Sequence, residues 1–260
     1  MLTRIISAAV LILIAAAVIF VSLWYSLPIA LVIFLSILNA FACYELLNNT
    51  GISKNRVTVV SAVVYGASAL LIYTYLPRFS LYAALIFGLV AVIAEKAKEQ
   101  SYKALVFSAV MPVLISYCFN CLVTLLGFGL PHILMLLNFS SICDSGAYFV
   151  GVTIGKHKLC PKISPKKTVE GAVGGIVFSL IGTAVIVRAF SLPSLGLMLL
   201  ITPVLCVASM CGDLGASLIK RRVGIKDYGK IIPGHGGIMD RFDSILLIAP
   251  IYVILYSLIG

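Results

Sequence analysis

Charged side chains are scarce in this sequence. Only 11% of its 260 residues are Asp, Glu, Lys or Arg, whereas a soluble domain carries about 25%. No polar stretch is long enough to enclose a hydrophobic core, which excludes a separate soluble domain. Apolar runs fill the chain instead, since 62% of its residues are hydrophobic. The main solvent of this protein is therefore expected to be a lipid bilayer.

Three other patterns are missing as well. The apolar runs do not alternate with polar residues, as the strands of a membrane β-barrel would. No basic stretch is extended enough to form a nucleic-acid-binding module, although the formal net charge is +10. Most of the seven cysteines lie in apolar runs, and the pair Cys118 and Cys121 has no second pair beside it. These cysteines are therefore interpreted as small apolar residues.

The apolar runs predict membrane-spanning helices, because about 20 apolar residues are needed to cross the hydrocarbon. The first run lacks a clear cleavage site and is expected to be a retained helix. The expected fold class is an all-α polytopic transmembrane helical bundle of about nine spans. The predicted spans are residues 5–24, 28–47, 57–76, 80–95, 104–126, 130–153, 169–190, 194–218 and 241–259.

Basic residues are distributed unevenly between the connections. Every second connection is short and almost uncharged, and the others are basic. With the N-terminus in the cytosol, all of the 19 Lys and Arg residues except Arg78 and Arg188 lie on the cytosolic side. Because Lys and Arg favour that side, the predicted topology has the N-terminus inside and the C-terminus outside. It places both polar loops, 154–168 and 219–240, in the cytosol.

Carboxylates are rarer still, and six of the nine lie between residues 144 and 243. A carboxylate at the centre of a membrane helix costs about 2.5–3.5 kcal/mol on insertion scales. Asp144 and Asp213 lie within or near the ends of predicted spans, so a cation or a cationic side chain should compensate them. Three other carboxylates are interpreted as interfacial residues without a role: Glu45, Glu95 and Glu99.

The densest set of polar residues lies in segment 212–244. Asp213, Ser217 and either Lys220 or Arg221 are three or four residues apart, so they would share one helix face. A glycine-rich turn follows, and glycine allows a backbone to approach a ligand closely. The segment then opens the last predicted helix with three charged residues, Asp240, Arg241 and Asp243. A helix N-terminus is a natural anion site, although carboxylates there can equally complement the helix dipole.

A second polar segment, 144–171, carries Asp144 and five lysines. Lysines in a cytosolic loop are often only a topology signal. Lys166 and Lys167 stand out because they adjoin a Ser/Thr pair and a helix start. Carboxylates, clustered cations and a glycine-rich turn together suit the handling of polyphosphate, with magnesium bound by carboxylates and phosphates.

The spacing of the C-terminal residues is that of a known signature: Ser-x-x-Lys-Arg, then Lys-Asp, a Pro-x-His-Gly-Gly turn and Asp-Arg-x-Asp. Its positions are occupied by Ser217, Lys220, Arg221, Lys226, Asp227, Pro233, His235, Gly236, Gly237, Asp240, Arg241 and Asp243. The upstream stretches DSGAYFVG and SPKKTVEG look similar to the same family. The chain thus resembles the CDP-diacylglycerol synthases, or phosphatidate cytidylyltransferases.

The resemblance implies transfer of the cytidylyl group of CTP to phosphatidate, which gives CDP-diacylglycerol and pyrophosphate in phospholipid biosynthesis. It implies magnesium held by Asp213 and Asp240, a second cation such as potassium, and a membrane homodimer. Residues 1–103 would form N-terminal membrane helices, and residues 104–260 the catalytic region. The expected catalytic residues are Asp213, Asp240, Lys220, Arg221 and Arg241. The expected substrate-binding residues are Ser217, His235, Gly236, Gly237, Lys166, Lys167, Asp243 and Asp144.

Some roles stay open on the sequence alone. His235 can bond a phosphate oxygen or the cytosine, or it can be structural. Asp144 can bind a cation, orient a lysine or contact the nucleotide, and Asp227 can simply pair with a neighbouring lysine. His132 and His157 are interpreted as incidental.

Two other functions compete with cytidylyl transfer. A CTP-dependent polyprenol or phytol kinase would transfer the γ-phosphate and release CDP. An ion-coupled transporter would place Asp144 and Asp213 on an ion path, but transporters often contain paired repeats, and none is evident here. The expected location is a bacterial inner membrane, with the active site facing the cytosol.

Overall fold

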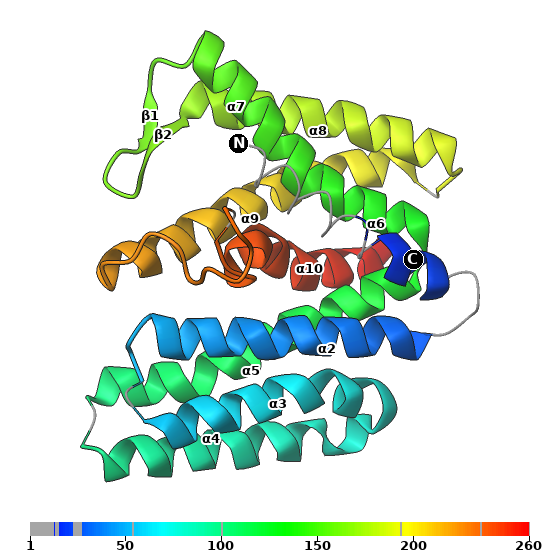
Figure 1. Cartoon of the computed structure of the whole chain (residues 1–260). Helices are drawn as coiled ribbons and strands as arrows, with labels where there is room; N and C mark the ends of the chain where they lie inside the picture. Colours follow the sequence, from blue (N-terminus) through cyan, green and yellow to red (C-terminus); the bar gives the residue numbers. More distant parts are fainter. Residues whose placement is uncertain are drawn as a thin grey trace. The chain divides into compact units, whose positions relative to one another are not determined.

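The structure is a computed structural model of the 260-residue chain (Figure 1). It describes residues 13, 16–22, 28–53, 55–99, 101–192, 194–234 and 236–259. The first predicted span, 5–24, lies largely outside these residues, and His235 lies outside them too. Within the described part, eight helices are long and apolar enough to cross a membrane. They correspond to the other eight predicted spans, so the all-α polytopic fold class is confirmed.

The chain divides into two compact units. Unit 1 comprises Met1–Val123 and Arg222–Phe242, and unit 2 comprises Thr124–Arg221 and Asp243–Gly260. The boundary expected after residue 103 concerns where the catalytic residues lie, and it stays a prediction.

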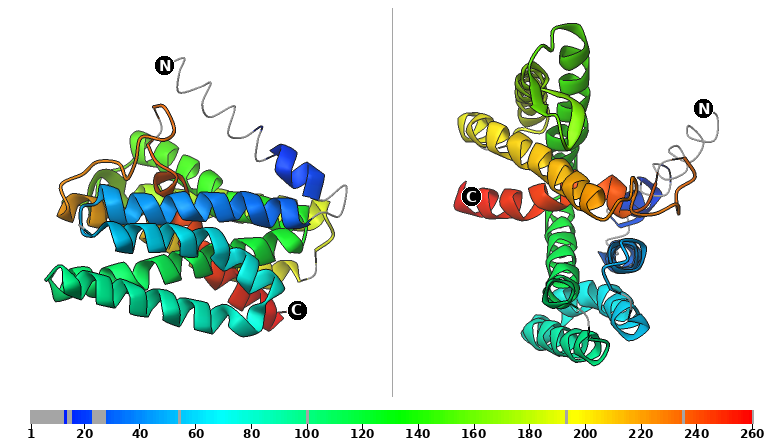
Figure 2. Two further views of the ribbon diagram at one scale, coloured as in Figure 1. Left: turned by 60° about the horizontal axis from the view of Figure 1, so that its bottom comes forward. Right: turned by 90° about the vertical axis from the view of Figure 1, so that its left-hand side faces the viewer.

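Among the residues that the structure describes, unit 1 contains four long helices. Helix α2 packs against α3, and α3 packs against α4, as Figures 1 and 2 show. At the end of α2, one π-helical turn, η1, replaces the regular α-helix. The bounds are α2 Pro28–Tyr44, η1 Glu45–Asn49, α3 Arg56–Tyr75, the 3₁₀ turn η2 Pro77–Phe79, α4 Ser80–Ala97 and α5 Tyr102–Gly127, which runs on past the unit's last residue.

Buried polar side chains tie the helices of unit 1 together. The Asn39 amide donates to Gly66 O and to Ser116 Oγ, each at 2.9 Å, and so links α2 to α3 and α5. The Asn55 side chain accepts from Val57 N at the start of α3 and donates to Ala94 O. In a bilayer such groups must find partners inside the protein, so these bonds hold the helices in register.

Unit 2 begins with a span made of three consecutive pieces, with a second π-helical turn at its centre. A two-stranded antiparallel hairpin then leads into α8, and α9 and most of α10 complete the unit. The bounds are α6 Leu130–Leu137, η3 Asn138–Ile142, α7 Cys143–Thr153, β1 Lys158–Cys160, β2 Ser164–Thr168, α8 Val169–Ala189, α9 Leu195–Arg222 and α10 Met239–Ile259.

The hairpin is a feature that the sequence analysis did not predict, because segment 154–168 was expected to be a loop. Lys158 pairs with Thr168, and Cys160 pairs with Ser164, with an irregularity between the two pairs. Strands this short, one of them containing a proline, give a weak sequence signal. Helix α9 also continues to Arg222, so Lys220 and Arg221 belong to the helix and not to the following loop.

Glycines bring α7 and α8 into close contact. A methyl group built on Gly174 would lie 2.5 Å from Val150 Cβ, and one on Gly175 would lie 2.6 Å from Cys143 O. Small residues at helix contacts let the backbones approach, which is how packing replaces the hydrophobic effect in lipid. The contact fixes where α7 ends and α8 begins, and therefore where the hairpin between them lies.

Replacing Gly174 with valine should destabilise unit 2, because the new side chain would overlap Val150. Overpacking costs about 1–3 kcal/mol, so the melting temperature of the purified protein in detergent should fall by several degrees. The matched control is Gly196→Val in α9, where a side chain meets open space. An equal melting temperature for both variants would contradict the close α7–α8 packing.

Candidate functional site

An ion pair joins the hairpin of unit 2 to α9. Lys167 Nζ on β2 lies 2.5 Å from Asp213 Oδ2, and the two side chains are only 25% and 28% exposed. Asp144 on α7 lies close enough to Lys167 and Asp213 to interact electrostatically with both. The structure thus brings together three predicted residues from two separate segments, 144–171 and 212–244, and Lys167 compensates Asp213 as expected.

These three residues line a cavity of about 180 Å³. The cavity combines charged groups with an apolar wall, and Asp144 is exposed while Lys167 Nζ is buried. A site with both characters suits a ligand that has a charged and an apolar part. The lining residues are Asp144, Ala147, Tyr148, Leu159, Lys166, Lys167, Thr168, Ala172, Met210 and Asp213.

Two side chains fix the hairpin to the start of α8. Thr168 caps the helix, since its Oγ1 accepts from Gly171 N at 3.1 Å. The Glu170 carboxylate accepts from the backbone N–H groups of Lys156 and His157, and it lies 2.6 Å from His157 Nδ1. His157, interpreted as incidental, therefore helps to hold the segment that leads into the hairpin. These contacts hold both ends of the hairpin segment at the start of α8.

A second cluster of predicted residues lies in unit 1, at the start of α10. Asp240 Oδ2 accepts from Tyr228 N at 2.7 Å and from Gly237 N at 2.9 Å. Gly236 has a φ of 87°, which favours glycine, and a side chain there would meet the Asp240 carboxylate. The loop closes on itself where Ile232 N donates to Gly236 O.

The outer face of this loop forms a cavity of about 580 Å³ with cations on its wall. Lys226, Lys230 and Arg241 are all exposed, and Asp227 is the carboxylate among the lining residues. The wall also contains backbone of three glycines, which allows close approach of a ligand. The full lining is Lys226, Asp227, Gly229, Lys230, Ile232, Pro233, Gly234, Gly236 and Arg241.

The same loop rests on a carboxylate to which the sequence analysis assigned no role. Glu45 is completely buried, and it accepts from Ile238 N at 3.1 Å and from Met239 N at 2.9 Å. Glu45 therefore has a structural role that was not predicted from the sequence. The available signal was an ionisable residue at the end of a 17-residue apolar helix, which by default marks a functional position in a membrane protein.

The other predicted residues are placed less informatively. Ser217, Lys220 and Arg221 lie on α9 after Asp213, and Lys220 is buried while Arg221 is exposed. Asp243 accepts from Ser244 N at 2.8 Å.

Asp213 belongs to unit 2 and Asp240 to unit 1, so a metal ion held by both stays a prediction. His132 donates or accepts at Tyr252 Oη, 2.9 Å away, in an aromatic cluster, which indicates a structural role.

The residues of unit 2 fit a magnesium ion in part. Among the described residues, no group of three or more His, Cys, Asp or Glu side chains could hold a metal ion. Asp144 and Asp213 line one cavity, however, and Lys167 already provides positive charge beside them. Magnesium usually takes one or two carboxylates, with water and substrate phosphates completing the set. Two carboxylates therefore suffice if a phosphate ligand is present.

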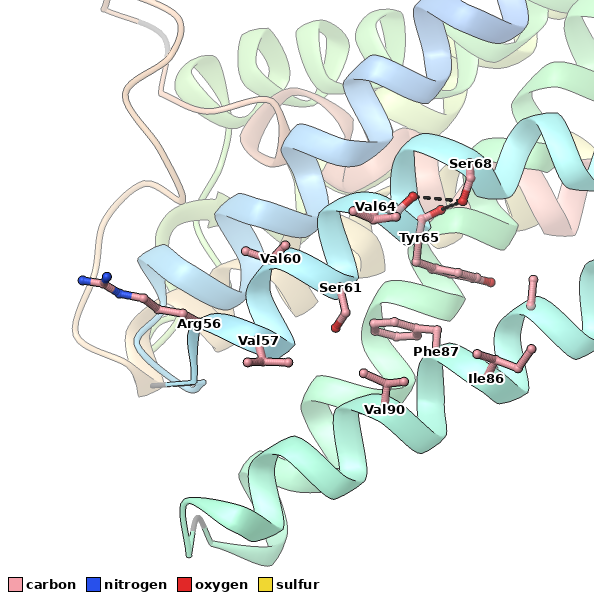
Figure 3. Close-up of a pocket in the computed structure, with 11 residues that line it drawn as sticks. Arg56, Val57, Val60, Ser61, Val64, Tyr65, Ser68, Ile86, Phe87 and Val90 are labelled. Carbon is pink, nitrogen blue, oxygen red and sulfur yellow. Dashed lines mark hydrogen bonds between the residues drawn. The ribbon is translucent and has the colours of Figure 1, made fainter.

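A further cavity, of about 670 Å³, lies between α3 and α4 and has a different character (Figure 3). Its wall is mainly apolar, with Val60, Val64 and Phe87 among its residues, and Arg56 stands at one end and points away. None of the predicted site residues lines it. Such a surface between two membrane-spanning helices suits lipid chains better than a nucleotide.

Comparison with known proteins places the chain in one family. It is 43% identical over 157 residues to a phosphatidate cytidylyltransferase of Bacillus subtilis, a match that covers 58% of each chain. It is 49% identical over 129 residues to one of Staphylococcus saprophyticus, and 46% identical over 129 residues to one of Staphylococcus haemolyticus, with 49% of each chain covered. The matched part thus spans about half the length of these relatives. The model of the cytidylyltransferase family, in contrast, matches residues 2–259, and the chain therefore belongs to the cytidylyltransferase family.

Proposed function

We propose that this protein is a phosphatidate cytidylyltransferase. It transfers the cytidylyl group of CTP to phosphatidate, and the products are CDP-diacylglycerol and pyrophosphate. The family match over residues 2–259 and the names of the bacterial relatives support this assignment. The membrane-spanning helices agree with it as well, since both the acceptor and the product are membrane lipids.

The observation that carries the proposal is the cationic cavity of unit 1. Lys226, Lys230 and Arg241 line it, and they come from the segment that carries the family signature. Cations that surround a transferred phosphoryl group stabilise the charge that develops on it and on the leaving group. Backbone of Gly234 and Gly236 at the wall permits close approach of phosphate oxygens. The cavity therefore suits the triphosphate of CTP.

The reaction needs alignment more than it needs a general base. A phosphate oxygen of phosphatidate attacks the α-phosphorus of CTP and forms a new P–O bond. The bond from that phosphorus to the bridging oxygen breaks, and pyrophosphate leaves with the electron pair. A phosphate monoester has a second pKa of about 6, so the nucleophile is largely ionised at neutral pH. The protein has to hold two anions together and neutralise the one that departs.

The charged residues of unit 2 have a complementary role in this proposal. Asp144 and Asp213 would hold the magnesium ion, which, when bound, offsets negative charge on the phosphates. Lys167 pairs with Asp213 and orients that carboxylate. The apolar part of the same cavity, formed by residues such as Ala147 and Met210, suits the hydrocarbon next to a lipid phosphate. We also propose Asp240 as a further metal ligand. A second cation such as potassium is part of the same proposal.

The proposal includes a location. The excess of Lys and Arg in alternate connections supports a cytosolic position for the hairpin and for the loop before α10. A cytosolic site agrees with a supply of CTP from the cytosol. The bacterial relatives support an inner membrane, and the family resemblance supports a homodimer.

Purified protein in detergent should move label from CTP labelled on the α-phosphate into the lipid phase when phosphatidate and magnesium are present. Pyrophosphate should appear in equal amount, and EDTA should stop both. Formation of CDP with a polyprenol acceptor and no labelled lipid would identify a lipid kinase instead. Folded protein that makes neither product would favour an ion-coupled transporter.

Asp213→Asn should lower kcat by at least about 100-fold, because it removes the charge that pairs with Lys167 and would bind the metal ion. Glu99→Gln, a change of the same charge at an exposed position just beyond the end of α4, is the matched control and should keep full activity. Asp213→Asn should also lower the melting temperature, because it leaves the largely buried Lys167 charge without its partner, so kcat is compared per folded molecule. A fully active Asp213→Asn protein would remove Asp213 from the site.

Lys230→Gln should raise the KM for CTP about tenfold, since a charge-assisted contact to a phosphate contributes about 1.5–3 kcal/mol. Lys98→Gln makes the same charge change at an exposed position outside the cavity and serves as the control. The KM for phosphatidate should stay the same in both variants. A change in that KM alone would assign the cavity to the lipid rather than to the nucleotide.

A further inference from the structure

The π-helical turn at the end of α2 presents two polar side chains to the loop before α10. Glu45 begins this turn and Asn49 ends it. Short π-helical segments frequently occur at functional sites, because the extra residue redirects side chains. Both side chains contact backbone more than 170 residues further along the chain. The turn, which directly follows α2, thus contacts the loop that carries the family signature.

Glu45 satisfies backbone donors that the start of α10 leaves open. The first N–H groups of a helix have no partner within it. Ile238 N donates to Glu45 Oε1, and Met239 N, in the first residue of α10, donates to Glu45 Oε2. Asp240 accepts from Gly237 N in the same way. Two carboxylates, one from α2 and one from α10 itself, therefore fix three consecutive peptide groups.

Glycines of the loop make room for this carboxylate. A side chain on either Gly229 or Gly237 would collide with the Glu45 oxygens. Gly237 belongs to the family signature, and its Cα lies 3.1 Å from the methyl position built on Gly229. The two arms of the loop thus converge on Glu45, which explains why a glycine is needed at each point.

Asn49 holds the other arm of the loop. Its Nδ2 donates to Tyr228 O at 2.7 Å, and Tyr228 is completely buried. The N–H of the same Tyr228 donates to Asp240. The backbone of Tyr228 is therefore held on both sides, its C=O by Asn49 and its N–H by Asp240, in addition to the direct contacts of Glu45.

We propose that Glu45 is a positioning residue for the signature loop. Its carboxylate would hold the backbone from Gly237 to Met239, and thereby set the direction of Asp240 and Arg241, which follow at once in the chain. This role for catalysis rests on the proposed cytidylyl transfer, whereas the anchoring of the loop does not. Glu45 is completely buried, so it would act through the loop and not through contact with the substrates.

The proposal requires a carboxylate and not only a polar group. Two oxygens accept from two N–H groups, and negative charge is favourable at the positive end of a helix. A glutamine has the same shape, but its NH₂ group would face one of the two donors and leave that donor unpaired in a buried place. Loss of such a bond changes the population of an open loop by about tenfold or more.

The test compares Glu45→Gln with Glu95→Gln in purified protein. Glu95 is the matched control because it is a buried glutamate of the same unit that accepts a hydrogen bond from Ser53 and does not contact the loop. The first measurement is trypsin cleavage after Lys226 and Lys230, quantified by mass spectrometry. Cleavage after Lys162, in the hairpin of the other unit, is the internal reference. The second measurement is kcat and KM for CTP per folded molecule.

Glu45→Gln should speed cleavage after Lys226 and Lys230 about tenfold relative to Lys162, and it should lower kcat about tenfold with little change in KM. Glu95→Gln should change neither.

Cleavage at the wild-type rate in Glu45→Gln would overturn the anchoring, whatever the wild-type enzyme does with CTP. Faster cleavage with an unchanged kcat would overturn the catalytic role while leaving the cytidylyl transfer itself intact. Wild-type protein that fails to use CTP, together with faster cleavage in the variant, would refute the proposed function and the positioning role for catalysis, but not the anchoring.

Discussion

A chain immersed in lipid has to satisfy its backbone donors from within, because water is not available to accept them. Helices satisfy most of these donors along their own axes. The loop before α10 is not helical, and several of its N–H groups donate to side chains instead. Glu45 and Asp240 accept from four N–H groups between Tyr228 and Met239. The shape of the loop that carries the family signature depends on these bonds.

The same constraint governs the charged site of unit 2. Lys167 and Asp213 are both largely removed from water, and either charge alone would be costly to bury. Each one stabilises the other, so the pair is stable until an anion or a cation of a ligand competes for one member. In the proposed reaction, substrate phosphates and magnesium would be such competitors. A pair of this kind keeps both charged groups in place before the substrates arrive, which reduces the cost of ordering them on binding.

The membrane spans and the family could be predicted from the sequence, whereas the role of Glu45 and the hairpin could not. Eight spans were found because about 20 consecutive apolar residues leave few alternatives, and the family emerged because Ser217 to Asp243 keep a fixed spacing. Glu45 was missed because its partners lie 193 and 194 residues away, beyond any local pattern. The hairpin was missed because lysines and a proline in short strands resemble a loop. The spacing of motif residues also does not reveal which backbone group each carboxylate accepts from.

The long separation between Glu45 and its partners has a consequence for biosynthesis. A ribosome adds about 5–20 residues per second, so roughly 10–40 s pass between the synthesis of Glu45 and that of Ile238. During that time α2 has to reside in the membrane with a carboxylate whose two N–H donors do not yet exist. Its place at the end of the helix lets the carboxylate remain at the water boundary until then. The loop before α10 can thus take its final shape only after Met239 has been synthesised, because both N–H donors to Glu45 exist only then.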